Sequence, residues 1–260
     1  MSRPAVRPDR QSRAQYGTWF NYVTRRENPR LRVLCLSGAG AGPSEFIPWG
    51  QLLPADVEIW PIQLPGRERR GREPLTTGLL ALVDDIQVAI GEHVPDDAPI
   101  VLFGHSFGAL VTYELARRLG QGGWPIVRLV VSGISAPHLP GRKSALADRT
   151  DDELLAWIRE LGGTPEELLA SDTFRDWLLT DLRASYRIRE LYEIADDPVI
   201  ECPIIAYGGA SDFETTRETL SAWGEYTSAL FDCHVLPGGH FFLRDHRQQF
   251  LAHLVGHALI

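Results

Sequence analysis

The sequence predicts an α/β fold in which a mostly parallel sheet carries helices on both faces. Short, nearly continuous apolar runs alternate with segments of helical periodicity, and small glycine-rich loops follow several of the runs. Such runs are typical of strands buried on both faces, and right-handed crossovers then place the intervening helices on both sides of the sheet. Ligands of these sheets bind at the carboxyl ends of the strands, so the glycine-rich loops mark the expected functional edge.

Length and composition are those of an ordinary globular protein. The chain has 260 residues, 44% of them hydrophobic and 23% charged, with a formal net charge of -8. The acidic balance argues against a nucleic-acid-binding protein, and no apolar run is long enough to span a membrane. We expect a flexible polar arm over 1–16, without the apolar segment of a secretory signal, and one domain over 17–260.

Cysteine usage favours an intracellular protein. Cys35, Cys202 and Cys233 lie in or beside predicted strands and lack C-x-x-C spacing. An odd number of such residues indicates buried free thiols in a reducing cytoplasm. We further expect a monomer that uses no cofactor or metal of its own.

The first half of the chain alternates strands with helices. The strands are apolar runs such as LRVLCL at 31–36, and the clearest helix, over 76–94, repeats its apolar residues at helical spacing. In chain order we expect a strand at 31–36, a small-residue loop at 37–43, a helix at 44–52, a strand at 57–62, an arginine-rich loop at 63–74, a helix at 76–94, a strand at 100–103, a helix capped by Gly120, and a strand at 127–131.

The alternation stops after Gly133, and residues 137–197 contain no convincing strand. We expect this segment to be a helical insertion above the carboxyl edge of the sheet, a lid; the alternative is extra helices packed to one side. Helices are expected from the capping box Thr150–Glu153 to Leu161, from a second capping box at Thr164–Glu167 with Pro165 at its first helical position, and over 172–192; strands at 203–207 and 232–236 and helices at 215–230 and 244–259 complete the chain.

The most informative stretch is Gly104-His105-Ser106-Phe107-Gly108, which reads G-x-S-x-G between an apolar run and a helix. In this nucleophile elbow a strand ends, the chain turns sharply and a helix begins at once, so the serine is held at the tip of a strained turn above the helix N-terminus. Glycines on either side let strand, turn and helix approach closely. We predict that Ser106 is a catalytic nucleophile.

A serine nucleophile needs a base, and the base needs an acid that fixes its tautomer. After a nucleophile elbow the acid and then the histidine follow in chain order, each at the carboxyl end of a strand. Of the eight histidines, only His240 lies in a glycine-rich loop straight after a late strand, so His240 is the predicted base. Asp212 directly follows the preceding strand and is the predicted acid, with Asp148 as the fallback. His105 is expected to point away from the serine and to have a packing role.

The oxyanion hole of such a site is made of two backbone N–H groups. One is expected from Phe107, the residue after the nucleophile, and the other from Ala39 in the small-residue loop at 37–42. A mere tight turn is the structural alternative for this loop. It also resembles a phosphate-binding turn, but it lacks the G-x-G-x-x-G spacing of a dinucleotide site.

Short phrases spread over residues 17–258 carry a family resemblance. They are Trp19-Phe20, Cys35-Leu36 with Gly38-Ala39-Gly40, Gln63 to Arg70, Gly104 to Leu110, Asp181-Leu182-Arg183-Ala184, Gly208-Gly209 before Asp212, and Gly238 to Leu243. Together they resemble the type II thioesterases that accompany polyketide synthases and nonribosomal peptide synthetases. L-P-G-R-E at 64–68 and G-G-H-F-F at 238–242 are the most specific. The resemblance implies the α/β-hydrolase fold, Ser106, Asp212 and His240 as the triad, and the helical insertion as the lid.

By this resemblance the substrate is an acyl group on the phosphopantetheine arm of an acyl or peptidyl carrier protein. The role is hydrolytic removal of stalled or aberrant acyl groups from a synthase. Three positions depart from the family pattern: Ser37 stands where proline is usual, Ala41 interrupts a glycine pair, and Ser185 replaces an acidic residue. The same triad would serve a product-releasing acyltransferase or cyclase, or a small-molecule carboxylesterase; a catalytically silent partner of a synthase is a further alternative.

Two arginine clusters offer docking surfaces for an acidic carrier protein. One covers residues 67–72, and the other is Arg183, Arg187 and Arg189 on the predicted lid. Local positive charge would offset the repulsion between two acidic proteins. For residues 67–72 we favour the structural interpretation, a solvated loop that Arg67 orders through internal hydrogen bonds.

Overall fold

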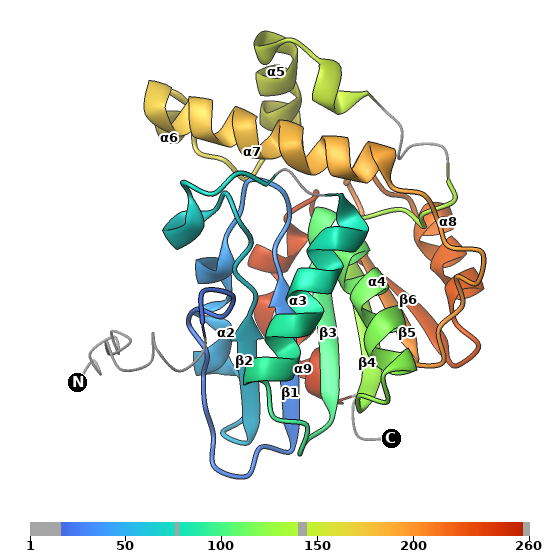
Figure 1. The fold of residues 1–260 in the computed structure, drawn as a ribbon. Coiled ribbons are helices and arrows are strands. Elements are labelled where there is room, and N and C mark those ends of the chain that lie inside the picture. Colours follow the sequence, from blue (N-terminus) through green and yellow to red (C-terminus); the bar gives the residue numbers. More distant parts are fainter. Residues whose placement is uncertain (1–16, 76–77, 140–144, 257–260) are drawn as a thin grey trace.

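A computed structural model describes residues 17–75, 78–139 and 145–256 (Figure 1). Within these ranges six strands form one sheet in the order β2-β1-β3-β4-β5-β6, and every neighbouring pair is parallel. The predicted α/β fold is confirmed. The strands are β1 (Leu31–Leu36), β2 (Val57–Pro61), β3 (Ile100–His105), β4 (Ile126–Ser132), β5 (Ile204–Gly209) and β6 (Phe231–Leu236).

Helices cover both faces of the sheet because successive strand residues point to opposite sides. Leu34 and Leu102 point into the core under α3 (Leu79–His93) and α4 (Phe107–Gln121), which lie in front of the sheet in Figure 1. Val33, Val101 and Phe103 point into the opposite core. That core is closed by α2 (Trp49–Leu52) and α9 (Arg247–Gly256).

One charged residue lies inside the apolar run of β1. Arg32 is 1% exposed, and its Nε lies 2.8 Å from Oε2 of Glu58 on β2. The indole Nε1 of Trp60 donates to the same carboxylate oxygen at 3.0 Å. Burial of both charges is tolerated because they are paired and hydrogen-bonded.

Four helical elements differ from the prediction in their bounds or in how they are divided. The helix expected at 44–52 is a 3₁₀ turn, η1 (Pro43–Phe46), followed by α2, because Pro48 cannot donate the hydrogen bond that would continue one helix. The helix expected at 215–230 is α8 (Arg217–Ser221) followed by the 3₁₀ turn η5 (Ala222–Tyr226). The last helix begins at Arg247 after the 3₁₀ turn η6 (Phe242–Arg244). Helix α4 continues past Gly120 to Gln121, and the positive φ belongs to Gly123.

The helical insertion lies across the carboxyl ends of the strands, at the top of Figure 1. Its described part contains no strand; it consists of η4 (Leu146–Asp148), α5 (Asp151–Leu161), α6 (Glu166–Leu169) and α7 (Asp172–Leu191). Leu154, Trp157, Leu178 and Tyr186 are among the residues of its own core. The insertion thus covers the edge where the sequence predicts the site.

The two capping boxes predicted in the insertion have different outcomes. Thr150 and Glu153 form theirs, with Glu153 N–H donating to Thr150 Oγ1 at 3.3 Å and Thr150 N–H to Glu153 Oε2 at 2.9 Å. The box at Thr164 is wrong, because Pro165 itself is extended with ψ 141° and becomes the N-cap of a helix that begins at Glu166.

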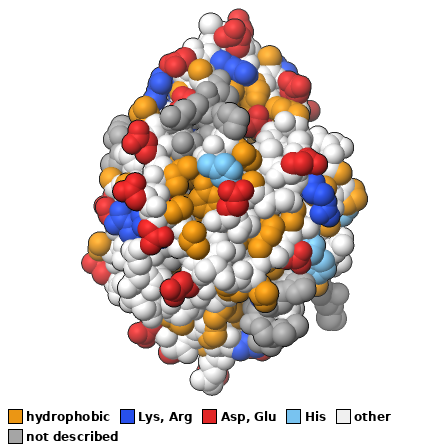
Figure 2. All heavy atoms as spheres, turned by 90° about the vertical axis from the view of Figure 1, so that its right-hand side faces the viewer, with side chains coloured by type: hydrophobic (Ala, Val, Ile, Leu, Met, Phe, Trp, Pro, Cys, Tyr) orange, Lys and Arg blue, Asp and Glu red, His pale blue; other side chains and the backbone are white. Residues whose placement is uncertain are grey.

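Several predictions fall on parts of the chain outside the described residues. These are the polar arm over 1–16, the first residues of the helix expected from Thr76, residues 140–144 of the insertion, and the end of the last helix beyond Gly256. No helix within the described ranges is long and apolar enough to cross a membrane. Acidic side chains are spread over the face shown in Figure 2, in keeping with the net charge of -8.

Candidate active site

Ser106 lies at the turn between β3 and α4 in a strained backbone conformation. Its φ is 51° and its ψ is -121°. A non-glycine residue in such a conformation costs about 1–3 kcal/mol and persists only where the surroundings hold it. Here Ser106 N–H donates to Ser132 O at 2.7 Å. A Cβ on Gly104 would lie 2.3 Å from Gly108 O, and one on Gly108 would lie 2.3 Å from Leu36 O, so only glycine fits on either side.

His240 and Asp212 form a buried pair at the same edge of the sheet. Asp212 follows β5 and His240 follows β6, and His240 Nδ1 lies 2.9 Å from Asp212 Oδ2. Glu214 N–H donates to Asp212 Oδ1 at 3.0 Å, and Thr215 Oγ1 donates to Oδ2 at 3.0 Å. A carboxylate held on Nδ1 leaves Nε2 as the proton-accepting nitrogen of the ring.

His105 packs against the base predicted for the site. Its ring centroid lies 4.8 Å from that of His240, and its Nδ1 lies 3.0 Å from Ser132 Oγ. Burial, and then the nearby His240, lower the pKa of His105 well below its ordinary value, so the ring is neutral. The packing role predicted for His105 is confirmed, because the buried ring packs against His240 and Phe241.

The small-residue loop after β1 lies beside Ser106. A Cβ on Gly38 would be 3.4 Å from Ser106 Cβ. Phe107 is the first residue of α4, and a helix leaves its first N–H groups without intrahelical partners. The two segments predicted to supply oxyanion donors, through Ala39 and Phe107, are therefore both next to Ser106.

The remaining candidates lie elsewhere. Asp148, the fallback acid, is in η4 and pairs with Arg187 of α7 at the surface. His234 pairs with Asp232 of its own strand, Nε2 to Oδ2 at 2.9 Å. His257 lies outside the described residues. Among the residues that the structure describes, no group of three or more His, Cys, Asp or Glu could hold a metal ion.

Comparison with known proteins identifies the family. A model described as the thioesterase domain matches residues 31–257. The chain belongs to the thioesterase domain family. The resemblance carried by the sequence phrases is thereby confirmed.

Relatives of this thioesterase are named for biosynthetic pathways and clusters. The gramicidin S biosynthesis protein GrsT of Aneurinibacillus migulanus is 36% identical over 239 residues, which cover 92% of this chain and 93% of that protein. The RedJ thioesterase of the prodiginine pathway in Streptomyces coelicolor has a TM-score of 0.82 and 38% identity, covering 89% of this chain and 91% of that one. The type II thioesterase BorB of the borrelidin cluster has a TM-score of 0.84 and 30% identity, with 93% and 98% covered.

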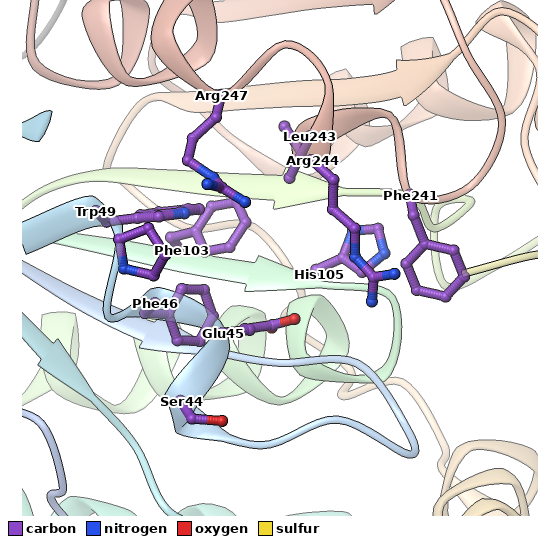
Figure 3. Close-up of a pocket in the computed structure, with 11 residues that line it drawn as sticks. Ser44, Glu45, Phe46, Trp49, Phe103, His105, Phe241, Leu243, Arg244 and Arg247 are labelled. Carbon is purple, nitrogen blue, oxygen red and sulfur yellow. The ribbon is translucent and has the colours of Figure 1, made fainter. Parts of the chain in front are cut away.

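Beside His105 and Phe241, the chain neighbours of Ser106 and His240, this thioesterase has a cavity of about 260 Å³ (Figure 3). It lies on the side of the sheet covered by α2 and α9, and His105 forms part of its wall. Glu45, Arg244 and Arg247 supply its charged groups. The apolar walls include the aromatic rings of Phe46, Trp49, Phe103 and Phe241.

Glu45 in this cavity is a carboxyl group that no sequence pattern singles out. Burial raises its pKa from 4.5 to about 7, against the opposing effect of Arg244. A raised pKa in the folded protein means that folding favours the protonated form, so the stabilisation is full below pH 4.5 and is lost as the pH rises through about 7.

We therefore expect Glu45→Gln to flatten the pH dependence of stability. Wild type should lose thermal stability relative to the variant between pH 5 and 8, because only wild type must ionise a half-buried carboxyl group whose pKa is raised to about 7. Melting temperatures measured across this range test the expectation, with the exposed Glu160→Gln as the control. Parallel curves for wild type and Glu45→Gln would contradict it.

The first arginine cluster is largely engaged within the thioesterase. Arg67 is fully buried and donates internal hydrogen bonds, as the structural interpretation predicted. Arg70 pairs with Glu73 at 2.7 Å, and its guanidinium lies 4.1 Å from the centroid of the Trp19 ring. Arg67 and Arg70 therefore order their own loop, whereas Arg69 and Arg72 are exposed.

The arginines of the second cluster, Arg183, Arg187 and Arg189, also interact within the chain. Arg183 pairs with Asp151 at 2.6 Å and donates to Ala147 O at 2.9 Å, which joins α7 to the start of α5. Arg187 pairs with Asp148, and Arg189 is buried. Arg183 and Arg187 therefore hold the lid together, and Arg189 pairs with Glu214 outside the lid at 3.7 Å.

Asp181 is the principal site residue that sequence reasoning did not assign. It lies on α7, and its Oδ2 accepts Gly40 N–H in the loop beside Ser106 at 2.7 Å. The only signal was its place in the Asp181-Leu182-Arg183-Ala184 phrase. No helical or strand periodicity relates it to a loop so distant in the chain.

Proposed function

We propose that this thioesterase hydrolyses acyl thioesters carried on the phosphopantetheine arm of acyl or peptidyl carrier proteins. The observation that carries the proposal is that Ser106, held at a strained turn, and the buried His240–Asp212 pair lie at the same edge of the sheet. The helical insertion covers this edge. The similarity of this chain to a type II thioesterase of the yersiniabactin NRPS/PKS biosynthetic pathway, and to the biosynthesis proteins above, supports the carrier-bound substrate. We propose that the chain acts as a single-domain, cytoplasmic monomer without a cofactor of its own; its three cysteines are free thiols.

In the proposed first half-reaction, Ser106 Oγ attacks the thioester carbonyl carbon while His240 Nε2 takes the hydroxyl proton. Asp212 keeps the ring in the required tautomer through Nδ1 and stabilises the imidazolium. The N–H groups of Ala39 and Phe107 bind the oxyanion. As the carbon–sulfur bond breaks, His240 returns its proton to the departing thiol, and the acyl group remains on Ser106.

In the second half-reaction, the oxygen of a water molecule attacks the acyl carbon while His240 takes a proton from that water. The tetrahedral intermediate then collapses, the free acid leaves, and the proton returns to Ser106 Oγ. A thiolate is a good leaving group, so hydrolysis needs little recognition of the acyl chain. Loose acyl selectivity suits an enzyme that removes stalled or aberrant acyl groups from a synthase, which is the role we propose.

The arginine contacts bear on how a carrier protein docks. Because Arg67, Arg70, Arg183 and Arg187 already have acidic partners within the chain, charge reversal there would disturb the fold as well as docking. Carrier binding is therefore best tested by changing the substrate and not by mutating these arginines. The same acyl group is offered on a carrier protein and on a short pantetheine mimic.

Intact-mass spectrometry of an acyl-carrier panel tests the proposed function. Each carrier, loaded with a different acyl group, is incubated with wild type or Ser106→Ala, and the same acyl groups are offered as simple oxygen esters. We expect wild type alone to return the carriers to the free-thiol form with release of the acid. Rapid turnover of oxygen esters with intact carriers would instead indicate an esterase, and acyl products lacking the added water would indicate an acyltransferase or cyclase.

A further inference from the structure

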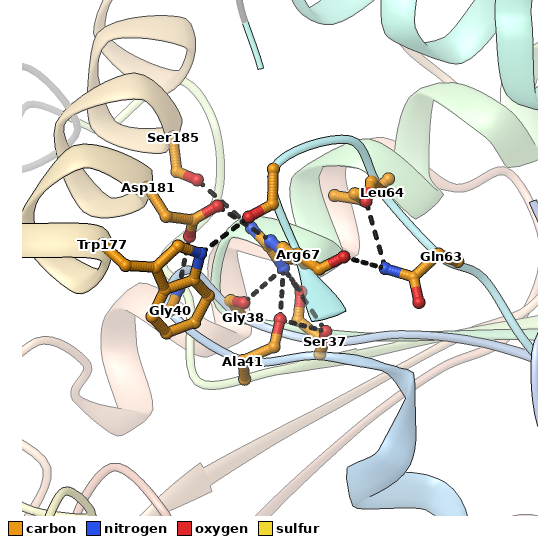
Figure 4. A network of polar contacts seen from close by, with 11 residues as sticks. Ser37, Gly38, Gly40, Ala41, Gln63, Leu64, Arg67, Trp177, Asp181 and Ser185 are labelled. Atoms are coloured by element: carbon orange, nitrogen blue, oxygen red, sulfur yellow. Dashed lines mark hydrogen bonds and ion pairs between the residues drawn. The ribbon is translucent and has the colours of Figure 1, made fainter. Parts of the chain in front are cut away.

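Arg67 and Asp181 form a buried ion pair that joins the loop after β2 to α7 of the lid (Figure 4). Arg67 Nε lies 3.2 Å from Asp181 Oδ1, and the two side chains are 1% and 2% exposed. Buried charges are costly unless they are paired and fully hydrogen-bonded. Both side chains therefore need further hydrogen bonds, and the groups that supply them are the parts of the chain that the pair holds in place.

Arg67 holds the peptide bond that precedes Ala39. Its Nη1 donates to Gly38 O at 2.7 Å. The carbonyl and the N–H of one trans peptide bond point in opposite directions, so fixing Gly38 O also fixes the direction of Ala39 N–H. The same nitrogen donates to Ala41 O at 2.9 Å, which holds the far end of the loop.

Asp181 holds the peptide bond that follows Ala39. Its Oδ2 accepts Gly40 N–H at 2.7 Å. Gly40 has a φ of +73°, and a Cβ there would lie 2.6 Å from Leu178 Cδ1, so α7 packs directly on this residue. The cation and the anion of one ion pair thus fix the two peptide bonds on either side of Ala39.

We propose that Arg67 and Asp181 are positioning residues for the oxyanion hole. The ion pair sets the direction of Ala39 N–H, and the positive charge at Gly38 O polarises the peptide bond so that Ala39 N–H becomes a stronger donor. The Arg67 guanidinium also lies 5.8 Å from the centroid of the Phe107 ring, so it contacts both segments of the hole. This inference rests on the proposed function, in which Ala39 N–H binds the oxyanion.

The same group of contacts also fixes the position of α7 above the two loops. Trp177 Nε1 donates to Gly66 O at 2.8 Å, so α7 holds the loop of Arg67 as well as the loop of Ala39. If α7 lifted, Gly40 N–H would lose its acceptor and Arg67 would lose its counter-ion. Any opening of the lid that preserves the oxyanion hole must therefore leave α7 in place.

Two variants and a matched control test the role of the pair. In Arg67→Lys a single ammonium group cannot reproduce the geometry of a guanidinium toward Gly38 O, Ala41 O and Asp181. Asp181→Asn removes the negative charge but keeps the size of the side chain. Ser185→Ala is the control, because Ser185 Oγ accepts from Arg67 Nη2 at 3.2 Å without touching the loop of Ala39.

The readouts separate transition-state from ground-state binding. A trifluoromethyl ketone accepts Ser106 Oγ at its carbonyl carbon, with the proton passing to His240, and the product carries an oxyanion in the hole. A thioether analogue of the substrate develops no such charge. We expect kcat to fall about 10- to 100-fold in Arg67→Lys and Asp181→Asn, with ketone affinity falling in parallel and with KM and thioether affinity little changed. Ser185→Ala should retain wild-type values.

Unchanged kcat and ketone affinity in folded variants would overturn the proposal. So would equal losses of ketone and thioether affinity that follow thermal stability, since a merely structural role has that result. If Arg67→Lys does not fold, Asp181→Asn decides alone. A wild-type protein that neither binds the ketone nor hydrolyses any thioester would refute the proposed function itself, which is a separate outcome.

Discussion

His240→Ala is expected to lose at least about 10⁴-fold in kcat for thioester hydrolysis while the protein stays folded. The imidazole must take the proton from Ser106 Oγ and later return it to the leaving thiol, and no other described side chain bonds to the Asp212 carboxylate as a base would. Asp212→Asn is expected to lose less, since the base remains and only its tautomer and charge stabilisation suffer.

Single-turnover kinetics with an acyl-carrier substrate measure this effect, and a serine-reactive fluorophosphonate reports independently on Ser106. Labelling should slow together with hydrolysis, because both reactions need the proton removed from Oγ. His234→Ala is the matched control: His234 lies on β6, just before the His240 loop, and pairs with Asp232 away from the site. Hydrolysis within tenfold of wild type in His240→Ala would contradict the assignment of the base.

The parts of the site that could be predicted are those encoded locally. The elbow can be read from five consecutive residues, since the two glycines and the serine are required by one tight turn. Asp212 and His240 could be singled out because each follows a strand that the sequence predicts, and parallel strands bring their carboxyl ends to one edge. The pairing of His240 with Asp212 at 2.9 Å agrees with that reasoning.

The parts that could not be predicted are pairings between distant segments. The sequence predicts internal hydrogen bonds from Arg67, but not its complete burial against Asp181 of the lid. Arg32 likewise interrupts an apolar strand without any local sign of Glu58 as its partner. A buried charge is stable only beside its counter-ion, and the choice of counter-ion is set by tertiary packing, about which periodicity carries no information.

Short elements were missed for a related reason. A helix of one or two turns gains little from propensity and depends on the contacts it makes in the folded protein. Pro48 therefore divides the predicted helix at 44–52, and Pro165 delays the start of α6. The long helices α3, α4 and α7 were predicted within a few residues, because each has an extended apolar face.

Gly104→Ala is expected to destabilise the protein by about 3 kcal/mol, the upper end of the usual cost of overpacking a core. The new Cβ would lie 2.3 Å from Gly108 O, 2.4 Å from the Ala109 Cα and 2.4 Å from Thr112 Oγ1. Two of these atoms belong to the backbone of α4, so the first turn of the helix must move away from β3. That turn carries Phe107 N–H and holds Ser106, so activity should fall on the order of 10²-fold even in the folded fraction.

Gly120→Ala on the same helix is the matched control, and we expect it to have the opposite sign. A Cβ at Gly120 would meet nothing within 4 Å. Alanine there should stabilise the helix by about 0.5–1 kcal/mol, because glycine loses more backbone entropy on folding. Urea denaturation of both variants measures the two free energies of unfolding, and hydrolysis assays give the activities. If Gly104→Ala were as stable as Gly120→Ala, close packing between strand and helix could not be what holds Ser106 in its strained conformation, and the elbow would owe its geometry to the hydrogen bond from Ser106 N–H to Ser132 O alone.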